Sequence, residues 1–205
     1  MAILGTSGDD QIVGTAAADT VFAGGSNDTV VGLSGNDNLG GAADADKLAG
    51  NAGNDALNGG DGNDLLLGGV GDDRIGGGAG NDVIYGGDGN DQITGGAGKD
   101  TLSGGTGKDT FIYTTASDSL AGTANRDVIT DFEYGVDKIG LTALRLTQAD
   151  VNFSKFYAGT DSTSGYAQIL RISTQHNGIY DMEIQINTRH LGVDLTFADL
   201  IGIRL

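Results

Sequence analysis

Aspartate recurs at every ninth position through the first half of the chain. Between Gly5 and Ile112 the sequence divides into twelve nine-residue units without insertion, and position six of every unit is Asp. Like charges held at one short repeat distance repel one another, so a chain that folds around such a row needs a cation to bind it. The twelve residues are Asp10, Asp19, Asp28, Asp37, Asp46, Asp55, Asp64, Asp73, Asp82, Asp91, Asp100 and Asp109.

Glycines supply the second kind of oxygen ligand. Position one is Gly in eleven units, with Ala23 as the exception, and position four is Gly in nine. Glycine adopts positive φ readily, so such segments turn tightly and expose backbone carbonyls. Calcium accepts about six to eight carboxylate and carbonyl oxygens, whereas magnesium demands a strict octahedron. The units hold no His or Cys for softer metals. We therefore expect calcium as the cation.

The repeat also predicts the elements that position these ligands. The last three positions of a unit, such as residues 101–103, suit one short strand whose middle residue faces inward. Two units make one 18-residue winding with a strand on each side. Stacked windings then pair their strands in parallel, about 4.8 Å apart. The position-six Asp residues of odd and even units would form two separate columns, and position eight, apolar in all twelve units, would form the core.

Residues 5–112 resemble the RTX (repeat-in-toxin) calcium-binding repeat, whose pattern is G-G-x-G-x-D-x-U-x. The resemblance implies an all-β fold, a right-handed parallel β-roll, with roughly five to ten Ca²⁺ ions between successive turns. Ala17, Ala23, Ser26 and Asp44 depart from the pattern, so we expect weak or absent sites in the first five units and the best sites from Asp55 to Asp109. The implied ligands are the position-six carboxylates and the carbonyls of Gly60, Gly62, Gly69, Gly71, Gly78, Gly80, Gly87, Gly89, Gly96, Gly98, Gly105 and Gly107.

Residues 113–205 have a different composition and are expected to form a second domain after the roll of residues 1–112. Residues 166–173 and 181–187 predict strands, with a turn at Asn177-Gly178 between them. Thr147 and Thr196 each precede a segment that predicts a short helix. We expect a mainly antiparallel β cap, because the last winding of a solenoid otherwise exposes apolar core and strand edges.

The start of this second half is similar to the C-terminal module of serralysin-type metalloproteases and to the R-modules of bacterial alginate epimerases. The similarity lies in 109–113 (DTFIY), 117–119 (SDS), 126–132 (RDVITDF) and 135–139 (GVDKI). It implies a segment that seals the roll and leads to an uncleaved C-terminal signal for type I secretion. Asp127 and Asp131 are either a further calcium site or a surface pair at a strand end.

Composition excludes several classes of protein. A net charge of −17 argues against nucleic-acid binding, and the absence of Cys excludes disulfides and thiolate metal sites. No apolar run is long enough to span a membrane, and the N-terminal residues do not resemble a cleaved signal peptide. His176 and His190 form no H-E-x-x-H motif. We expect no enzyme here, although a catalytic domain could be attached in a longer parent protein.

The expected function is a calcium-triggered folding module, secreted without a cleaved N-terminal signal peptide and extracellular when folded. Its partners would be calcium ions and the type I secretion machinery. One alternative is a module that binds an anionic polysaccharide such as alginate, and another is a surface-layer or adhesin structure. The candidate glycan contacts are Arg145, Lys155, Tyr157, Arg171, Arg189 and His190, which could equally be ordinary cap surface.

Overall fold

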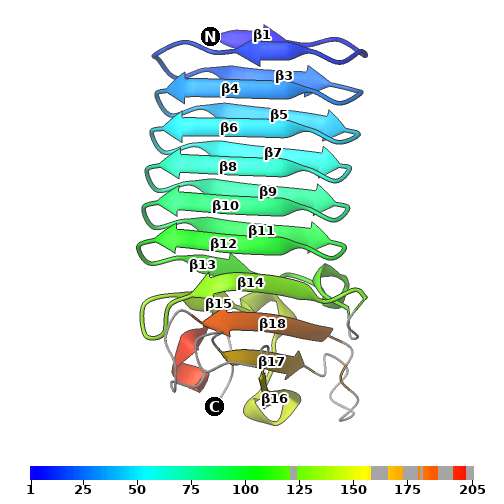
Figure 1. Cartoon of the computed structure of the whole chain (residues 1–205), viewed down its shortest axis with the longest axis vertical. Helices are drawn as coiled ribbons and strands as arrows, with labels where there is room; N and C mark the ends of the chain where they lie inside the picture. Colours follow the sequence, from blue (N-terminus) through cyan, green and yellow to red (C-terminus); the bar gives the residue numbers. More distant parts are fainter. Residues whose placement is uncertain (121–123, 158–165, 173–179, 181, 189–195, 202–205) are drawn as a thin grey trace.

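The computed structural model describes residues 1–120, 124–157, 166–172, 180, 182–188 and 196–201. It shows an elongated roll of stacked windings, with the N-terminus at one end and the C-terminal half at the other (Figure 1). The roll strands are β1 (Ala2–Leu4), β2 (Gln11–Val13), β3 (Thr20–Gly24), β4 (Thr29–Ser34), β5 (Asn38–Ala43), β6 (Lys47–Ala52), β7 (Ala56–Asp61), β8 (Leu65–Val70), β9 (Arg74–Ala79), β10 (Val83–Asp88), β11 (Gln92–Ala97), β12 (Thr101–Thr106) and β13 (Thr110–Ile112).

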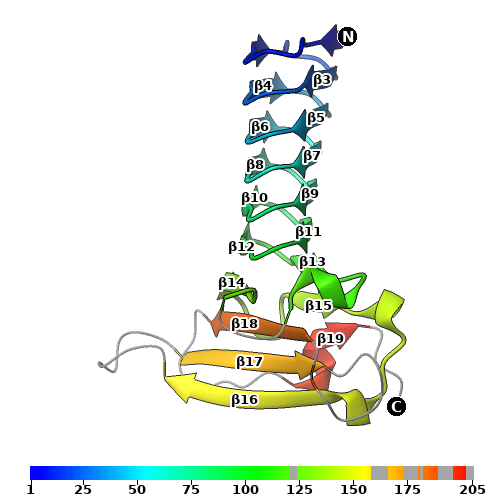
Figure 2. The ribbon, with the colours of Figure 1, turned by 90° about the vertical axis from the view of Figure 1, so that its right-hand side faces the viewer.

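Two parallel sheets face each other across the roll (Figure 2). Sheet A contains β1, β3, β5, β7, β9, β11 and β13, and sheet B contains the even-numbered strands β2 to β12. The register is that of the repeat: Ile84 in β10 lies beside Leu66 in β8 and Leu102 in β12. The predicted parallel β-roll of two-unit windings is confirmed.

The strands are longer than the three residues that the sequence predicts. From β4 to β12 each has six residues, as in β7 (Ala56–Asp61), because positions one to three of the next unit continue the strand. Glycine has low strand propensity when considered alone. In the roll, however, its backbone pairs with the same position of the neighbouring winding, as Gly60 does with Gly78. Only three residues, such as 62–64, remain for each turn.

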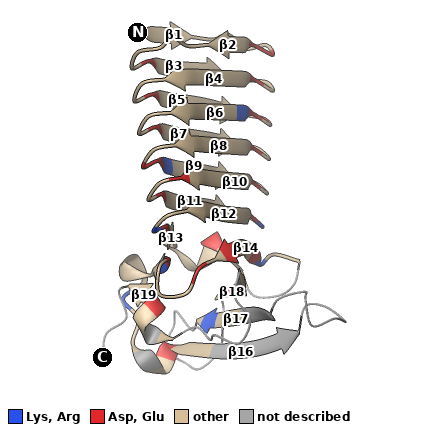
Figure 3. Cartoon of the chain, turned by 60° about the vertical axis from the view of Figure 1, so that its left-hand side comes forward, with Lys and Arg blue, Asp and Glu red and all other residues tan. Residues whose placement is uncertain are grey.

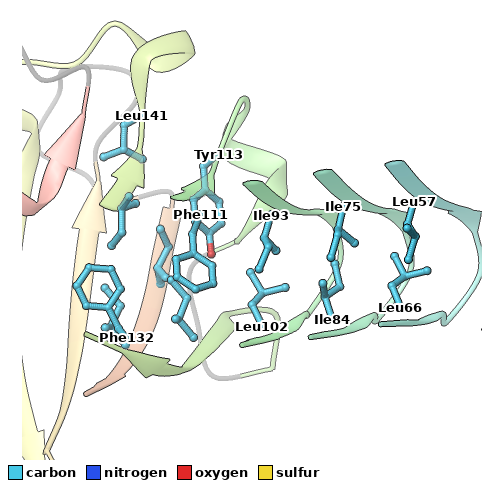
Figure 4. Close-up of a cluster of buried hydrophobic side chains, with 14 of the residues drawn as sticks. Leu57, Leu66, Ile75, Ile84, Ile93, Leu102, Phe111, Tyr113, Phe132 and Leu141 are labelled. Atoms are coloured by element: carbon cyan, nitrogen blue, oxygen red, sulfur yellow. The ribbon is translucent and has the colours of Figure 1, made fainter. Parts of the chain in front are cut away.

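The core is one row of aliphatic side chains from each sheet. All twelve position-eight residues, from Ile12 to Phe111, are buried. Figure 4 shows Leu57, Ile75 and Ile93 facing Leu66, Ile84 and Leu102. At the C-terminal end the rows meet Phe132, whose ring centroid lies 6.2 Å from that of Phe111. A continuous apolar interior therefore joins the roll to the second half of the chain.

The second half extends both sheets. Strands β14 (Asp127–Phe132) and β18 (Met182–Thr188) continue sheet B in parallel, while β15 (Lys138–Gly140) and β19 (Leu200–Ile201) continue sheet A. The antiparallel part consists of β16 (Val151–Tyr157), β17 (Tyr166–Ile172) and β18. The described cap is thus a mixed sheet, and a domain division at residue 112 stays a prediction, because the sheets run across that point.

The short helices of the cap are 3-10 turns. They are η1 (Ala116–Asp118), η2 (Thr142–Leu144), η3 (Gln148–Asp150) and η4 (Phe197–Asp199). The last two follow Thr147 and Thr196 as predicted. The turn predicted at Asn177-Gly178 lies outside the described residues.

Candidate calcium sites

The position-six aspartates stand in two columns, one along each edge of the roll. Figure 3 shows acidic residues recurring at the turns. The first column contains Asp10, Asp28, Asp46, Asp64, Asp82 and Asp100, and the second contains the other six. In both, the Asp backbone N–H donates to Oδ1 of the Asp one winding later, at 2.7–2.9 Å. From Asp19 onward these side chains are 0–3% exposed.

The second carboxylate oxygen is different. Within the described residues, Oδ2 is buried without a hydrogen-bond partner in every ladder residue from Asp28 to Asp109. Removing a charged oxygen from water without a partner is costly. Each of these oxygens therefore lacks what a bound cation would supply.

Backbone oxygens converge on the same places. A Cβ at Gly59 would lie 2.1 Å from Asp64 Oδ2 and 2.6 Å from the Gly77 carbonyl oxygen, so a side chain there would displace one of these oxygens. At positions two and four the carbonyls point at the next winding: a Cβ at Gly78 would lie 2.0 Å from Gly60 O, and one at Gly80 would lie 1.6 Å from Gly62 O. Carboxylate and carbonyl oxygens of successive windings thus gather in the turns, which is the donor set that calcium prefers.

These sites depend on the backbone as much as on side chains. Among the described residues, no three or more Asp, Glu, His or Cys side chains cluster closely enough to hold a metal ion by themselves. A site built here must combine carboxylates with turn carbonyls, as the glycine geometry suggests.

Burial also changes the acidity of the ladder. It raises the pKa of Asp82 and Asp109 to about 7, and that of Asp46, Asp73 and Asp91 to about 6, with neighbouring carboxylates adding to the rise. Burial likewise raises the pKa of Asp100 to about 6. Ionised ladder aspartates therefore destabilise the folded roll unless a proton or a cation neutralises them.

Both columns continue past the repeats. The Asp100 N–H donates to Asp127 Oδ1 at 2.8 Å, and the Asp109 N–H donates to Asp137 Oδ1 at 3.0 Å. Burial and the nearby Asp100 carboxylate raise the pKa of Asp127 to about 9. Sequence reasoning missed Asp137, because the spacing changes there from 18 to 28 residues. The G-x-D-x-I of residues 135–139 repeats positions four to eight of a unit and could have revealed it.

Asp131 has different surroundings from Asp127. Its carboxylate accepts hydrogen bonds from Ser103 Oγ at 2.6 Å and from the N–H groups of Gly104 and Gly105 at 3.0 Å. These donors hold Asp131 against the end of β12 in the way a turn holds an anion. Of the pair, only Asp127 continues a ladder column.

The candidate glycan contacts are spread out where they are described. Arg145 is exposed at the end of η2. Arg171 Nε lies 2.7 Å from Glu183 Oε1, and Arg126 pairs with the same carboxylate at 3.0 Å. The side chains of Lys155 and Tyr157, together with Arg189 and His190, lie outside the described residues.

A groove that sequence reasoning missed lies on the outer face of sheet A. It has a volume of about 310 Å³ and crosses strands β5, β7, β9 and β11. Its polar lining consists of Asn38, Asn58, Arg74, Gln92 and Thr94, which occupy positions seven and nine of their units. These outward positions vary between units, so the repeat pattern itself does not reveal them.

Known proteins resemble the chain in its repeats and in its overall structure. The family model of the RTX calcium-binding nonapeptide repeat (four copies) matches residues 4–39, 40–75 and 76–111. The solution structure of the AlgE6R3 subunit of the Azotobacter vinelandii mannuronan C5-epimerase is 30% identical, with a TM-score of 0.51 over 67% of this chain and 77% of that one. The AlgE6R2 subunit of the same enzyme is 20% identical, with a TM-score of 0.42 over 100% of this chain and 95% of that one.

A search of curated protein sequences gives no significant match. No helix among the described residues is long and apolar enough to cross a membrane.

Proposed function

We propose, because this chain belongs to the RTX calcium-binding nonapeptide repeat family, that its β-roll is a calcium-dependent folding module. The repeats imply calcium binding, and the proposal concerns which residues bind the ions and what binding does. The ligands would be the unpartnered Oδ2 atoms from Asp28 to Asp109 and carbonyl oxygens of the turns, chiefly those of positions two and four. Roughly five to ten ions would fill the two columns.

The observation that carries this proposal is the row of buried Oδ2 atoms without partners. Residues 1–112 contain 17 acidic and 4 basic residues, a net charge of −13, and seven calcium ions would supply +14. Without them, charge repulsion and the conformational entropy of the glycines oppose folding. Each site that binds an ion only in the folded roll adds RT ln(1 + [Ca²⁺]/Kd) to the free energy of unfolding.

This linkage gives the module a use in secretion. With affinities like those of extracellular calcium modules, about 10⁻⁴–10⁻³ M, the chain would stay unfolded in the cytosol and fold in millimolar calcium outside. An unfolded chain suits type I export, after which the cap would seal the last winding. The proposal assigns no reaction to the module itself, which would stabilise its own fold or that of an attached exoprotein.

Circular dichroism with and without calcium tests the proposal. In excess chelator at pH 7.5 we expect little β signal, and in millimolar calcium we expect the β signal of a folded roll. Magnesium at the same concentration is the matched control and should not restore it, since the carbonyl-rich turns suit calcium better. An unchanged β signal after chelation would refute the calcium-dependent folding.

A second candidate function is calcium-dependent binding of an anionic polysaccharide. Two observations favour it: the 30% identity to a subunit of a mannuronan C5-epimerase, and the polar groove with Arg74 on sheet A. Amide groups suit sugar hydroxyls, and a guanidinium group suits uronate carboxylates. Calorimetric titration of the calcium-loaded chain with oligomannuronate should show binding that Arg74→Ala weakens and Arg145→Ala leaves unchanged. Equal affinity of the wild-type and Arg74→Ala chains would exclude the groove as the binding surface.

A further inference from the structure

The first two turns of the roll hold their aspartates differently from the later ten. In units one and two, position two is Thr, and both its N–H and its hydroxyl donate to the Asp carboxylate. Thr6 donates to Asp10 Oδ2 at 2.6 and 2.9 Å, and Thr15 donates to Asp19 Oδ2 at 2.6 and 2.8 Å. The oxygen that lacks a partner from Asp28 onward therefore has two donors here.

The carboxylate has also moved. A Cβ at position one of units one and two would lie 2.8–2.9 Å from Asp Oδ2, whereas the corresponding distance is 2.1–2.3 Å from Gly32 to Gly104. The carbonyl of the next winding is still close to the same Cβ positions in both turns, at 1.9 Å (Ala23 O) and 2.7 Å (Gly32 O), so only the carboxylate oxygen lies elsewhere, beside its threonine donors.

The backbone separates the same two groups of turns. From unit three to unit twelve, positions two and four both have positive φ, including non-glycine residues such as Leu33 (81°), Ala42 (96°) and Asp44 (73°). Thr6, Gly8, Thr15 and Ala17 do not have positive φ. Side chains resist this conformation, so the later turns keep it at a cost, while the first two turns avoid it.

The same Thr–Asp arrangement recurs where the nonapeptide pattern has ended. Three times a threonine N–H and hydroxyl both donate to Oδ2 of an aspartate three or four residues later, at 2.6–3.0 Å: Thr114 with Asp118, Thr147 with Asp150, and Thr196 with Asp199. In all three pairs the aspartate is the last residue of a 3-10 turn of the cap: η1, η3 and η4.

We infer that threonine at position two closes the first two turns, which means that its N–H and hydroxyl take the place of an ion at Oδ2; the later turns, whose Oδ2 has no donor, are open. Asp10 and Asp19 are then not calcium ligands, and the columns of ions begin at Asp28 and Asp37. The inference rests on the proposed calcium binding and adds where that binding begins. The physical reason is that the N–H and the hydroxyl of threonine occupy both lone-pair directions of Oδ2, whereas from Asp28 onward this oxygen has no hydrogen-bond donor. Threonine thus supplies protein donors to the carboxylate oxygen that the later turns leave for a metal, and Oδ1 of Asp19 lies 2.8 Å from the N-terminal ammonium group.

Native mass spectrometry in saturating calcium tests the inference by counting ions per chain. We expect the Asp10→Asn/Asp19→Asn double variant to bind as many ions as wild type. The matched variant Asp64→Asn/Asp73→Asn, which changes one residue in each column among the open turns, should bind at least two fewer. An equal loss in both variants would overturn the inference, because Asp10 and Asp19 would then be ligands like the rest.

The opposite substitution tests whether threonine is the cause. Thr6→Gly/Thr15→Gly should allow the open turn and add one or two ions, whereas Thr6→Ser/Thr15→Ser keeps both donors and should leave the count unchanged. A glycine variant with the wild-type count would overturn the role of threonine. A wild-type chain that binds no calcium would instead refute the proposed function, and this inference with it, so the two failures are distinguishable.

Discussion

The N-terminal and C-terminal windings of the roll share their strands and core but differ in their turns. Position eight is buried from Ile12 to Phe111, and the parallel register is the same throughout. The turns fall into three groups. Units one and two are closed by threonine, units three to six are open with non-glycine residues at positive φ, and units seven to twelve are open with glycine at both positive-φ positions.

The strand positions and the turn positions of the repeat therefore have separate roles. The inward aliphatics and the pairing of equivalent strands specify the winding, so a turn can change without loss of the coil. The turn positions specify whether an aspartate is held by the protein or left for an ion. Capacity for calcium can therefore vary along a roll whose shape stays constant.

The largest expected effect comes from placing a methyl group in a regular turn. In Gly77→Ala the Cβ would lie 2.2 Å from Asp82 Oδ2 and 2.4 Å from Gly95 O, so the carboxylate must leave its place beside the carbonyl. We expect a loss of roughly 3 kcal/mol or more in the free energy of unfolding with calcium present. Calcium-dependent thermal unfolding measures it.

Gly76→Ala is the control for that experiment. Its Cβ would meet only Asn58 Oδ1, at 3.8 Å, on the outer face of the sheet, so its stability should change little. Ala23 already stands at position one in unit three, where it is fully buried. Ala23→Gly should therefore strengthen calcium binding in that turn. Similar stability of the Gly77→Ala and Gly76→Ala variants would show that position one does not shape the sites.

Without metal, lowering the pH should affect the stability of the first winding and of the later windings in opposite directions. The pKa values of Asp82 and Asp109 are raised to about 7, so the folded later windings bind protons that the unfolded chain, with Asp near 3.8, has released. Their stability without calcium is present at low pH and is lost as the pH rises from about 4 to 7. The N-terminal ammonium group and Thr15 instead lower the pKa of Asp19 to about 2, and that contribution disappears only as the pH falls below 3.8 toward 2.

Circular dichroism in chelator measures this pH dependence. We expect the β signal to increase from pH 7.5 to pH 4.5, where the later ladder is protonated and Asp19 is still ionised. The chain carrying Asp82→Asn and Asp109→Asn is the control, and it should show a smaller pH dependence because those two positions no longer titrate. A wild-type signal that decreases over the same range contradicts the raised pKa values.

The sequence predicts the roll well because the repeat period directly determines which residues face inward and which strands pair. A 9-residue period with one inward aliphatic determines two columns, a parallel register and a core, and each of these is found in the structure. The strand length was wrong, since glycines at positions one to three disfavour strands until a neighbouring winding pairs with them. Asp137 was missed because the connection before it is longer than a unit.

The threonine-closed turns could not be predicted from the pattern alone. Thr6 and Thr15 stand where the repeat pattern has glycine, so the sequence shows that they differ from the pattern but not what they do. Their role depends on the direction of a hydroxyl and an N–H toward one carboxylate oxygen, which is a matter of side-chain geometry. The groove around Arg74 was missed for a related reason: its residues are adjacent only after strands 18 residues apart are paired.

The smallest expected effect concerns the middle group of turns. Ala42 has a φ of 96° at a position that is glycine in every unit from seven onward. Ala42→Gly should relieve strain of about 1–2 kcal/mol, less about 0.5–1 kcal/mol for the greater freedom of glycine in the unfolded chain. A net gain of about 1 kcal/mol should appear in calcium-dependent thermal unfolding. Ala79→Gly, at position three without positive φ, gives only the entropic loss and should destabilise. If both variants lose stability equally, then the non-glycine turns are unstrained, and what distinguishes the middle windings from the last ones is composition rather than conformational energy.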